Sequence, residues 1–375
     1  MSSILRVLHV GSGNLYGGVE TALVALARFR HLCPGMEPQF ALSFEGRLSQ
    51  ELTGAGATVH QLGEVRTRKP WTVWSARKRL RELLSREHFD VVVCHMPWPM
   101  AVFGKAVEGS GSRLAFWAHD VPKGRHWLER WASRLSPDLA IGNSFFTQGS
   151  IPLLFPEAPC SVIYPPATLS PSDEDHGGRA AVRKDLDVKD ETVVIIQVSR
   201  MEGWKGHRLH LEALGKLKRH ANWICWMVGG AQRPAEQQYM QSIQQQAAQL
   251  GIADRVQFLG QRSDVPRLLA AADIFCQPNL GPEPFGLVFV EALSARLPVV
   301  TTAMGGPQEI IDASCGIVVP PNQADQLADA LRRLIDSSEL RAGLGQRGPE
   351  RARELCDPGL RMLDLYEVLE RVSRN

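Results

Sequence analysis

Arg200 and Lys205 lie five residues apart in the segment SRMEGWKGH, directly after an apolar run and just before Gly206. Two cations on one loop at the end of a strand suit a diphosphate, because they can neutralise the negative charge of a phosphorylated leaving group. The alternative interpretation is a solvated basic loop without a ligand. The segment is therefore a candidate anion-binding loop.

A second segment, GPEPFGLVFVEALSARLPVVTT, carries two glutamates eight residues apart. Glu283 falls in a proline-rich loop, and Glu291 falls about two turns along a helix that we expect to begin near Phe285. The backbone N–H groups of Gly286 and Leu287 would then lie at the helix N-terminus, where anions such as diphosphates bind. Glu283 also fits a plainer interpretation, an acidic residue favoured by the helix dipole.

Two further candidates lie in the N-terminal half of the chain. Gly17 and Gly18 belong to GSGNLYGGVET, a glycine-rich loop between an expected strand and an expected helix. Its spacing departs from the dinucleotide pattern G-x-G-x-x-G, but glycine still allows a ligand to approach the backbone closely. His119, in WAHD at the end of an expected strand, is either a base or polar contact in a cleft or a structural histidine.

Several chemistries have no support in the sequence. It contains no H-E-x-x-H motif, no D-x-D pair at a strand end, no G-x-S-x-G elbow and no P-loop, so we expect no metal site. Lys and Arg total 42 against 40 Asp and Glu, and this net charge of +2 argues against a nucleic-acid partner. The seven scattered cysteines, the lack of a signal-peptide pattern and the lack of about 18 consecutive apolar residues predict a cytoplasmic protein.

The elements that position these residues alternate along the chain. Short apolar runs are separated by helix-length amphipathic stretches, which predicts an α/β fold of parallel strands and crossover helices. A stretch rich in Pro, Ser, Asp and Gly at 165–190 is predicted to link two such domains. Strands are expected at 4–10, 39–44, 57–62, 90–95, 113–119, 136–144, 192–199, 223–230, 255–260, 273–278, 297–302 and 316–321, and helices at 18–30, 324–335 and 360–374, among others.

Together these motifs resemble the donor-site signature of retaining glycosyltransferases of family four, the group 1 glycosyl transferases. The resemblance extends over essentially the whole chain and is most specific over 192–320. It rests on Arg200 with Lys205-Gly206, on Glu283-Pro284-Phe285-Gly286-Leu287 with Glu291-Ala292, and on the Gly17-Gly18-Val19-Glu20 turn and the His119-Asp120 pair.

That resemblance implies the GT-B fold, an α/β architecture of two Rossmann-like parallel-sheet domains facing across a cleft. Residues 1–170 would form the acceptor-binding domain, and residues 190–355 would form the domain that binds the nucleotide-sugar donor. A C-terminal helix at 356–375 would cross back and pack on the N-terminal domain.

The same resemblance implies roles for individual residues. Arg200 and Lys205 would clamp the donor diphosphate, Glu291 would bind the ribose hydroxyls, and His119 would contact the sugar near the reacting centre. The resemblance also places Glu283 and the backbone amides of Phe285, Gly286 and Leu287 against the sugar and the β-phosphate. The Gly17-Gly18 loop would approach the phosphates. Arg262, in the segment LGQRSD, would lie against the base. Asn279 and Gly281-Pro282 depart from the family pattern and leave the identity of the sugar open.

By this resemblance the chain is expected to be an enzyme that moves a sugar from a nucleotide-diphosphate sugar, UDP being favoured over GDP. The acceptor would be a hydroxyl of a saccharide, a lipid-linked or a small-molecule compound. Besides the donor as co-substrate, no cofactor is expected, and the hypothesis is a metal-independent front-face route that retains the anomeric configuration. A nucleotide-sugar epimerase, a phosphorylase-like enzyme and a non-catalytic sugar-nucleotide binder stay open as alternatives.

A basic stretch at 66–86 holds eight Lys or Arg residues against one acidic residue, Glu82, and includes Trp71 and Trp74. A second group of basic residues and tryptophans follows at 123–134. Such a mixture suits a negatively charged acceptor or peripheral contact with an anionic membrane, which would be the inner face of the cell membrane. The alternative is a pair of solvated helix faces whose tryptophans pack on the core.

Overall fold

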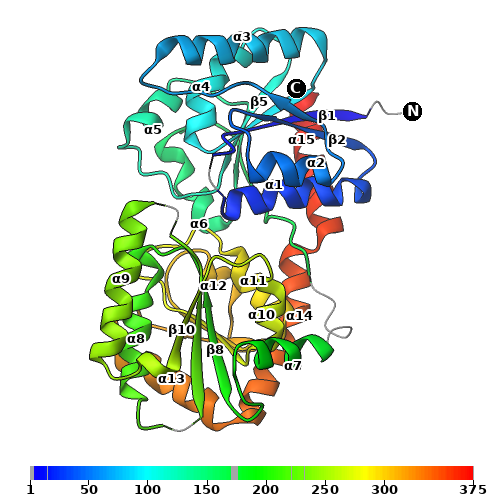
Figure 1. Ribbon diagram of the computed structural model, residues 1–375. Coiled ribbons are helices and arrows are strands. Elements are labelled where there is room, and N and C mark those ends of the chain that lie inside the picture. Colours follow the sequence, from blue (N-terminus) through cyan, green and yellow to red (C-terminus); the bar gives the residue numbers. More distant parts are fainter. Residues whose placement is uncertain (1–3, 15, 170–175, 221, 232, 375) are drawn as a thin grey trace. The chain divides into compact units, whose positions relative to one another are not determined.

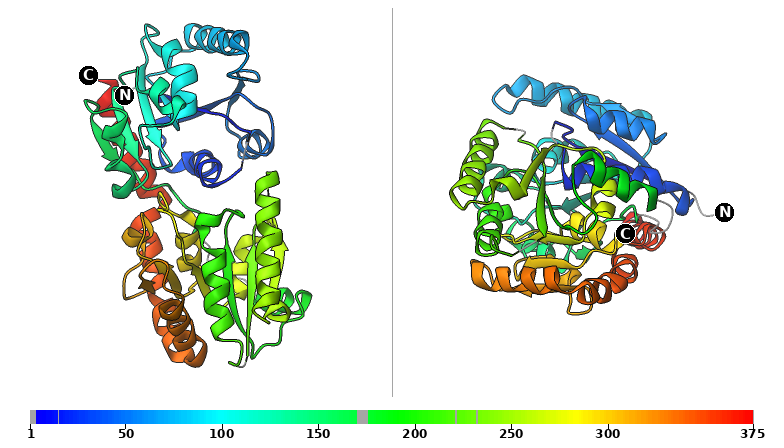
Figure 2. Two further views of the ribbon diagram at one scale, coloured as in Figure 1. Left: turned by 90° about the vertical axis from the view of Figure 1, so that its left-hand side faces the viewer. Right: turned by 60° about the horizontal axis from the view of Figure 1, so that its bottom comes forward.

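The structure, a computed structural model, describes residues 4–14, 16–169, 176–220, 222–231 and 233–374 (Figure 1). The chain divides into two compact units, one of Met1–Thr168 with Cys356–Asn375 and the other of Leu169–Leu355. Each unit is built around its own parallel sheet, with helices on both faces (Figure 2). No helix in this described part of the chain is both long and apolar enough to cross a bilayer.

The first unit has a seven-stranded sheet in the order β3-β2-β1-β4-β5-β6-β7. Its central strands are buried on both faces, which explains why they form continuous apolar runs in the sequence. The strands are β1 (Leu5–Gly11), β2 (Met36–Leu42), β3 (Val59–Gln61), β4 (Val91–His95), β5 (Arg113–Ala118), β6 (Leu139–Gly142) and β7 (Cys160–Val162).

Helices cover both faces of this sheet. Helices α3, α4 and α5 bury apolar side chains against one face, and α1, α2 and α15 do so against the other. Met362, Leu365 and Leu369 of α15 are fully buried, so the C-terminal helix packs on the N-terminal domain. The helices are α1 (Gly18–Phe29), α2 (Arg47–Gly54), α3 (Pro70–Arg86), α4 (Pro97–Val107), α5 (Trp127–Ala132), α6 (Phe145–Gln148) and α15 (Pro358–Ser373), with 3-10 turns at Arg30–Leu32 and Ile151–Leu153.

The second unit has a six-stranded parallel sheet in the order β10-β9-β8-β11-β12-β13, and α8, α9 and α13 pack against one face. The strands are β8 (Val193–Val198), β9 (Trp223–Val228), β10 (Val256–Gly260), β11 (Ile274–Gln277), β12 (Val299–Thr302) and β13 (Gly316–Val319). The helices are α7 (His176–Asp185), α8 (His207–Lys216), α9 (Pro234–Gln249), α10 (Val265–Ala271), α11 (Leu287–Ser294), α12 (Pro307–Ile310), α13 (Ala324–Asp336) and α14 (Ser338–Cys356), with 3-10 turns at Gly203–Lys205 and Ala253–Arg255.

The predicted architecture of two Rossmann-like parallel-sheet domains is confirmed. Two local interpretations are wrong: the presumed linker at 165–190 contains helix α7, and Trp71 and Trp74 do not pack on the core but are 65% and 64% exposed. Strand β7 and helix α14 were not anticipated. All seven cysteines are free, and only Cys160 among them is not fully buried.

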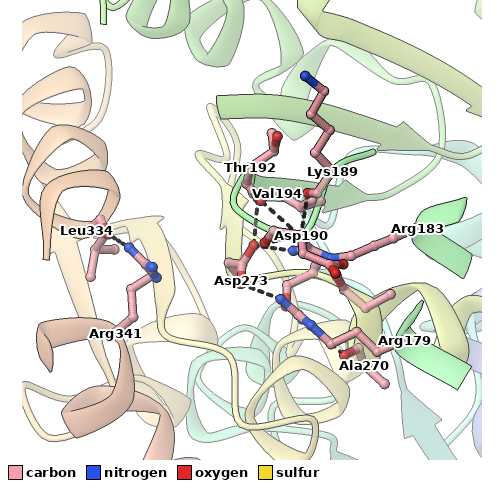
Figure 3. Close-up of polar contacts among 12 residues, drawn as sticks. Arg179, Arg183, Lys189, Asp190, Thr192, Val194, Ala270, Asp273, Leu334 and Arg341 are labelled. Atoms are coloured by element: carbon pink, nitrogen blue, oxygen red, sulfur yellow. Dashed lines mark hydrogen bonds and ion pairs between the residues drawn. The ribbon is translucent and has the colours of Figure 1, made fainter. Parts of the chain in front are cut away.

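Arg183 fastens helix α7 to the second sheet (Figure 3). Its side chain is 1% exposed and donates a hydrogen bond to Asp273 Oδ2 at 2.5 Å. Asp273 also accepts from Arg179 Nη2 at 2.8 Å and from the backbone N–H of Val194 at 2.7 Å. The remaining donors of Arg183 are satisfied by the carbonyls of Ala271, Lys189, Asp190 and Thr192. A buried charge that is paired and fully hydrogen-bonded is tolerated in a protein interior.

We expect Arg183→Met to lower the free energy of unfolding by about 3 kcal/mol, because it leaves the partly buried carboxylate of Asp273 without its closest cation. Lys184→Ala, at an exposed position of the same helix, is the matched control and should change stability by less than about 0.5 kcal/mol. Denaturant unfolding of the two variants measures the difference. Equal stabilities would contradict this role of Arg183.

Candidate active site

Two loops of the second unit meet at the carboxyl ends of strands β8 and β11. β8 pairs with β9 on one side and with β11 on the other, so the direction of strand order reverses at this place. Ligands of open α/β sheets bind in the crevice at such a switch point. The loop after β8 carries Arg200 and Lys205, and the loop after β11 carries Glu283. The two charged segments singled out in the sequence therefore converge.

Gly206 allows the two loops to touch. Its φ is +76°, and a Cβ atom at this position would lie 1.7 Å from the carbonyl oxygen of Pro278. The carbonyl of Trp204 accepts hydrogen bonds from the N–H groups of Leu280 at 2.7 Å and Gly281 at 3.3 Å. Position 206 thus requires glycine both for its backbone conformation and for the close approach of the loops.

Lys205 and Glu283 form an ion pair across this junction. Nζ of Lys205 donates a hydrogen bond to Oε2 of Glu283 at 2.5 Å, and the two side chains are only 13% and 11% exposed. The same ammonium group lies 4.0 Å from the ring centroid of Trp204, close enough for a cation–π interaction. Because an ammonium group has three donors, Lys205 can hold Glu283 and a phosphate oxygen at the same time.

Gln277 and Asn279 support Glu283 from the end of β11; the sequence motifs did not mark Gln277, and Asn279 was noted only as a departure from the family pattern. Both are fully buried, and Nε2 of Gln277 and Nδ2 of Asn279 each lie 3.5 Å from Glu283 Oε2. Oγ1 of Thr302 donates to the carbonyl of Asn279 at 2.6 Å and fixes its backbone. In the sequence, these two residues could be recognised as polar residues at the end of an otherwise apolar strand.

Carboxylates hold Arg200 in place. Its Nη2 donates to Glu236 Oε1 at 2.5 Å and lies 3.3 Å from Glu202 Oε1. Glu236 is in the first turn of α9, has a side chain only 7% exposed, and was missed because nothing in its local sequence links it to Arg200. Nε of Arg200 is buried and has no hydrogen-bond partner within the described residues. Arg200 is thus oriented by two carboxylates.

The N-terminus of helix α11 follows Glu283 in the chain. Gly286 is the N-cap, with φ +100°, so the helix begins at Leu287 rather than near Phe285. The first turn of a helix leaves backbone N–H groups without intrahelical acceptors, and these groups attract anions. Glu291 lies one turn further on, and burial raises its pKa. Burial disfavours its charged form, and hydrogen bonds from ligand hydroxyls would stabilise that form.

The remaining residues predicted for the site do not belong to these two loops; they are Arg262, Gly17, Gly18 and His119. Arg262 is exposed after β10 and pairs with Asp264 through contacts of 2.8 and 2.7 Å, which lower the pKa of that carboxyl group. Gly17, at the N-cap of α1, and Gly18, its first residue, belong to the first unit. His119 also belongs to the first unit, directly after β5.

The arrangement in the second unit is suited to an anion. Arg200, Lys205 and the first turn of α11 offer positive charge and N–H groups at one end of the sheet, where they can stabilise negative charge on a leaving group. Within the described residues, no group of three or more His, Cys, Asp or Glu side chains could hold a metal ion.

Comparisons with known proteins agree with this arrangement of motifs. Residues 178–351 match the family described as "Glycosyl transferases group 1", and residues 16–170 match "Glycosyltransferase Family 4". The lipopolysaccharide glucosyltransferase WaaG of Escherichia coli strain K12 is 33% identical over 216 residues, which are 56% of this chain and 53% of WaaG. The match thus spans about half the length of that relative.

A GDP-mannose-dependent alpha-(1-6)-phosphatidylinositol monomannoside mannosyltransferase of Mycolicibacterium smegmatis is 26% identical over 289 residues, which are 72% of this chain and 73% of that protein. Among solved structures, Anabaena Alr3699/HepE in complex with UDP and glucose superposes with a TM-score of 0.86 at 24% identity, covering 98% of this chain and 100% of HepE. The WaaG structure gives a TM-score of 0.70 at 22% identity, covering 98% of each chain. These structural likenesses show the GT-B fold.

We expect Gly206→Ala to lower the free energy of unfolding by about 3 kcal/mol, because backbone strain adds to the overlap with Pro278. Gly251→Ala is the matched control, since Gly251 has a φ of +70° and open space around its Cβ position. The Gly251→Ala variant should lose only about 1–2 kcal/mol of its free energy of unfolding, which is the cost of backbone strain alone. Denaturant unfolding tests the pair, and equal losses would contradict the close approach of the two loops.

Proposed function

The chain belongs to the group 1 glycosyl transferases, and on that premise we propose that it transfers a sugar from a nucleotide-diphosphate sugar to an acceptor hydroxyl. The observation that carries the proposal is the nearly buried contact between Lys205 and Glu283 at the switch point of the second sheet. It places a cation and a carboxylate beside the N-terminus of α11, as a charged leaving group and a polar sugar require.

The proposed chemistry follows from the charges. Breaking the bond between the anomeric carbon and the phosphate oxygen leaves positive charge on the sugar ring and negative charge on the diphosphate. Arg200, Lys205 and the first turn of α11 stabilise the diphosphate, and Glu283 lies next to the sugar. Since these side chains supply the positive charge, the reaction proceeds without a metal ion.

The route we propose is a front-face displacement with retention of configuration. In this route the acceptor oxygen approaches the anomeric carbon from the side that the diphosphate leaves. A phosphate oxygen takes the acceptor proton, so the new C–O bond forms as the old one breaks and no enzymatic nucleophile is needed. The role of the protein is to hold the diphosphate in place and to exclude water.

The donor we propose carries UDP. The Anabaena HepE structures were determined with UDP, UDP and glucose, and UDP-glucose, whereas the M. smegmatis relative is named as GDP-mannose-dependent. Glu291 would bind the ribose hydroxyls, and Arg262 would lie against the base after releasing Asp264. Phe285, Gly286 and Leu287 would offer backbone amides to the phosphate and sugar.

The first unit is proposed to bind the acceptor, a saccharide, lipid-linked or small-molecule alcohol. His119 would contact the donor sugar, and the Gly17-Gly18 loop would approach the phosphates through its backbone. The need for an acceptor distinguishes glycosyl transfer from epimerisation, because an epimerase converts a nucleotide sugar without an acceptor. Measured transfer of the sugar would exclude the alternative of a non-catalytic sugar-nucleotide binder.

Helix α3 supports a proposed peripheral contact of this unit with anionic membranes. Val73, Ala76 and Leu80 are buried, whereas Trp71 and Trp74 point outward. Lysine ammonium groups accompany both indoles, with Lys69 5.9 Å from the Trp71 ring and Lys78 5.9 Å from the Trp74 ring. Exposed tryptophans beside cations suit the interface of an anionic bilayer.

Arg200→Ala and Lys205→Ala are each expected to lower kcat/KM by about 100-fold or more, because each removes a charge that stabilises the leaving diphosphate. Lys216→Ala is the matched control, since Lys216 is an exposed cation of the same unit paired with Asp325. Product formation from UDP-sugar and acceptor, measured with EDTA present, gives the rates. Turnover of both variants near that of the control would overturn the assignment.

Replacing Trp71 and Trp74 together by Ser should weaken binding to vesicles containing anionic phospholipid by about tenfold or more. The reason is that each aromatic side chain that moves from water into the bilayer contributes about 1.5–3 kcal/mol to the binding free energy. Leu360→Ser, at an exposed apolar position on α15, is the control. Co-sedimentation at low and high salt measures the binding. No wild-type binding at low salt would rule out the membrane contact.

A further inference from the structure

Three histidines of the first unit form a hydrogen-bonded row that we call the histidine ladder: His9 on β1, His95 at the end of β4 and His119 after β5. These strands are neighbours in the sheet order β1-β4-β5. Nδ1 of His9 lies 2.9 Å from Nε2 of His95, and Nδ1 of His95 lies 2.8 Å from Nε2 of His119. Each contact is a hydrogen bond between two imidazole nitrogens.

Aromatic rings enclose the ladder. Trp117 stacks on both His95 and His119, with centroid separations of 5.3 Å, and Phe40 stacks on His9 at 5.4 Å. His9 and His95 are 1% and 2% exposed, whereas His119 is half-buried. Burial lowers the pKa of His9 and of His119 to about 3 and that of His95 well below its usual range. All three rings are therefore neutral near pH 7.

Neutral imidazoles in such a row can be arranged in only two ways, because each ring carries one N–H and one bare nitrogen. In the first arrangement every Nδ1 is protonated, His9 donates to His95, and His95 donates to His119. Nδ1 of His119 is then a donor. In the second arrangement every Nε2 is protonated, the row runs the other way, and Nδ1 of His119 is a bare acceptor.

The buried end of the ladder distinguishes the two arrangements. Nε2 of His9 is buried and has no hydrogen-bond partner within the described residues. The second arrangement would put an N–H group there with no acceptor, and buried N–H groups without partners are rarer in proteins than incompletely satisfied acceptors. The first arrangement leaves a bare nitrogen instead.

We propose that His95 is a positioning residue that, with His9 behind it, holds His119 as the tautomer protonated at Nδ1. His119 then presents a fixed hydrogen-bond donor at the exposed end of the ladder, where it meets a ring or hydroxyl oxygen of the donor sugar. The contact with the sugar rests on the proposed glycosyl transfer, but the tautomer does not.

The first test is histidine ring nitrogen NMR of the wild-type protein without ligands. The expected result for His119 is a protonated Nδ1 and a bare Nε2, with the same pattern for His95. A protonated Nε2 on His119, or a mixture of both tautomers, would overturn the proposal. This measurement needs neither turnover nor a variant.

His95→Phe gives the functional test, because phenylalanine keeps a ring beside Trp117 but removes both hydrogen bonds of the ladder. We expect His119 to lose its single tautomer and kcat/KM to fall about tenfold, the equivalent of one neutral hydrogen bond. The affinity for UDP alone should stay unchanged. His60→Phe is the matched control, since His60 on β3 hydrogen-bonds only Gln39 among the described side chains and lies outside the ladder.

A merely structural role of His95 would lower turnover without changing the tautomer of His119, and that outcome would overturn the proposal. Unchanged kcat/KM together with a lost tautomer would also overturn it. If the wild-type protein neither binds a nucleoside diphosphate nor turns over, the proposed function fails, while the ring nitrogen spectra still decide the tautomer.

Discussion

Lys205 and Glu283 belong to different loops, and their contact depends on the backbones of those loops passing at van der Waals distance. The carbonyl of Pro278 lies where a side chain at position 206 would be, so only glycine lets the loop after β8 reach the loop after β11. The backbone hydrogen bonds of Trp204 then fix the junction. Lys205 and Glu283 take their relative positions from this close approach.

A nearly buried ion pair is weak evidence for stability, because removing two charges from water costs about as much as their attraction returns. Its value in this protein is orientation. Gln277 and Asn279 hold the carboxylate of Glu283, and Glu236 holds the guanidinium of Arg200. Groups that are already oriented need little rearrangement when negative charge develops nearby, and this preorganisation is the main source of electrostatic stabilisation in enzymes.

Much of this architecture could be predicted from the sequence, because strands buried on both faces form apolar runs and the loops after them carry the charged motifs. Helix α7 was missed because polar and proline-rich residues precede it, and what fixes it is the tertiary contact between Arg183 and Asp273. Glu236 and the histidine ladder were missed for a related reason. Their partners are 24 to 86 residues away in the chain, and strand order rather than local spacing brings them together.

We propose that the second unit binds a nucleoside diphosphate through its own cations. A thermal-shift panel of UDP, GDP, UMP and uridine, with EDTA present throughout, tests it most directly, since a ligand that binds only the folded state raises the apparent melting temperature. We expect a clear rise in melting temperature with UDP, a smaller one with GDP and UMP, and none with uridine. No rise with any nucleoside diphosphate, or a rise only after a divalent metal replaces EDTA, would contradict it.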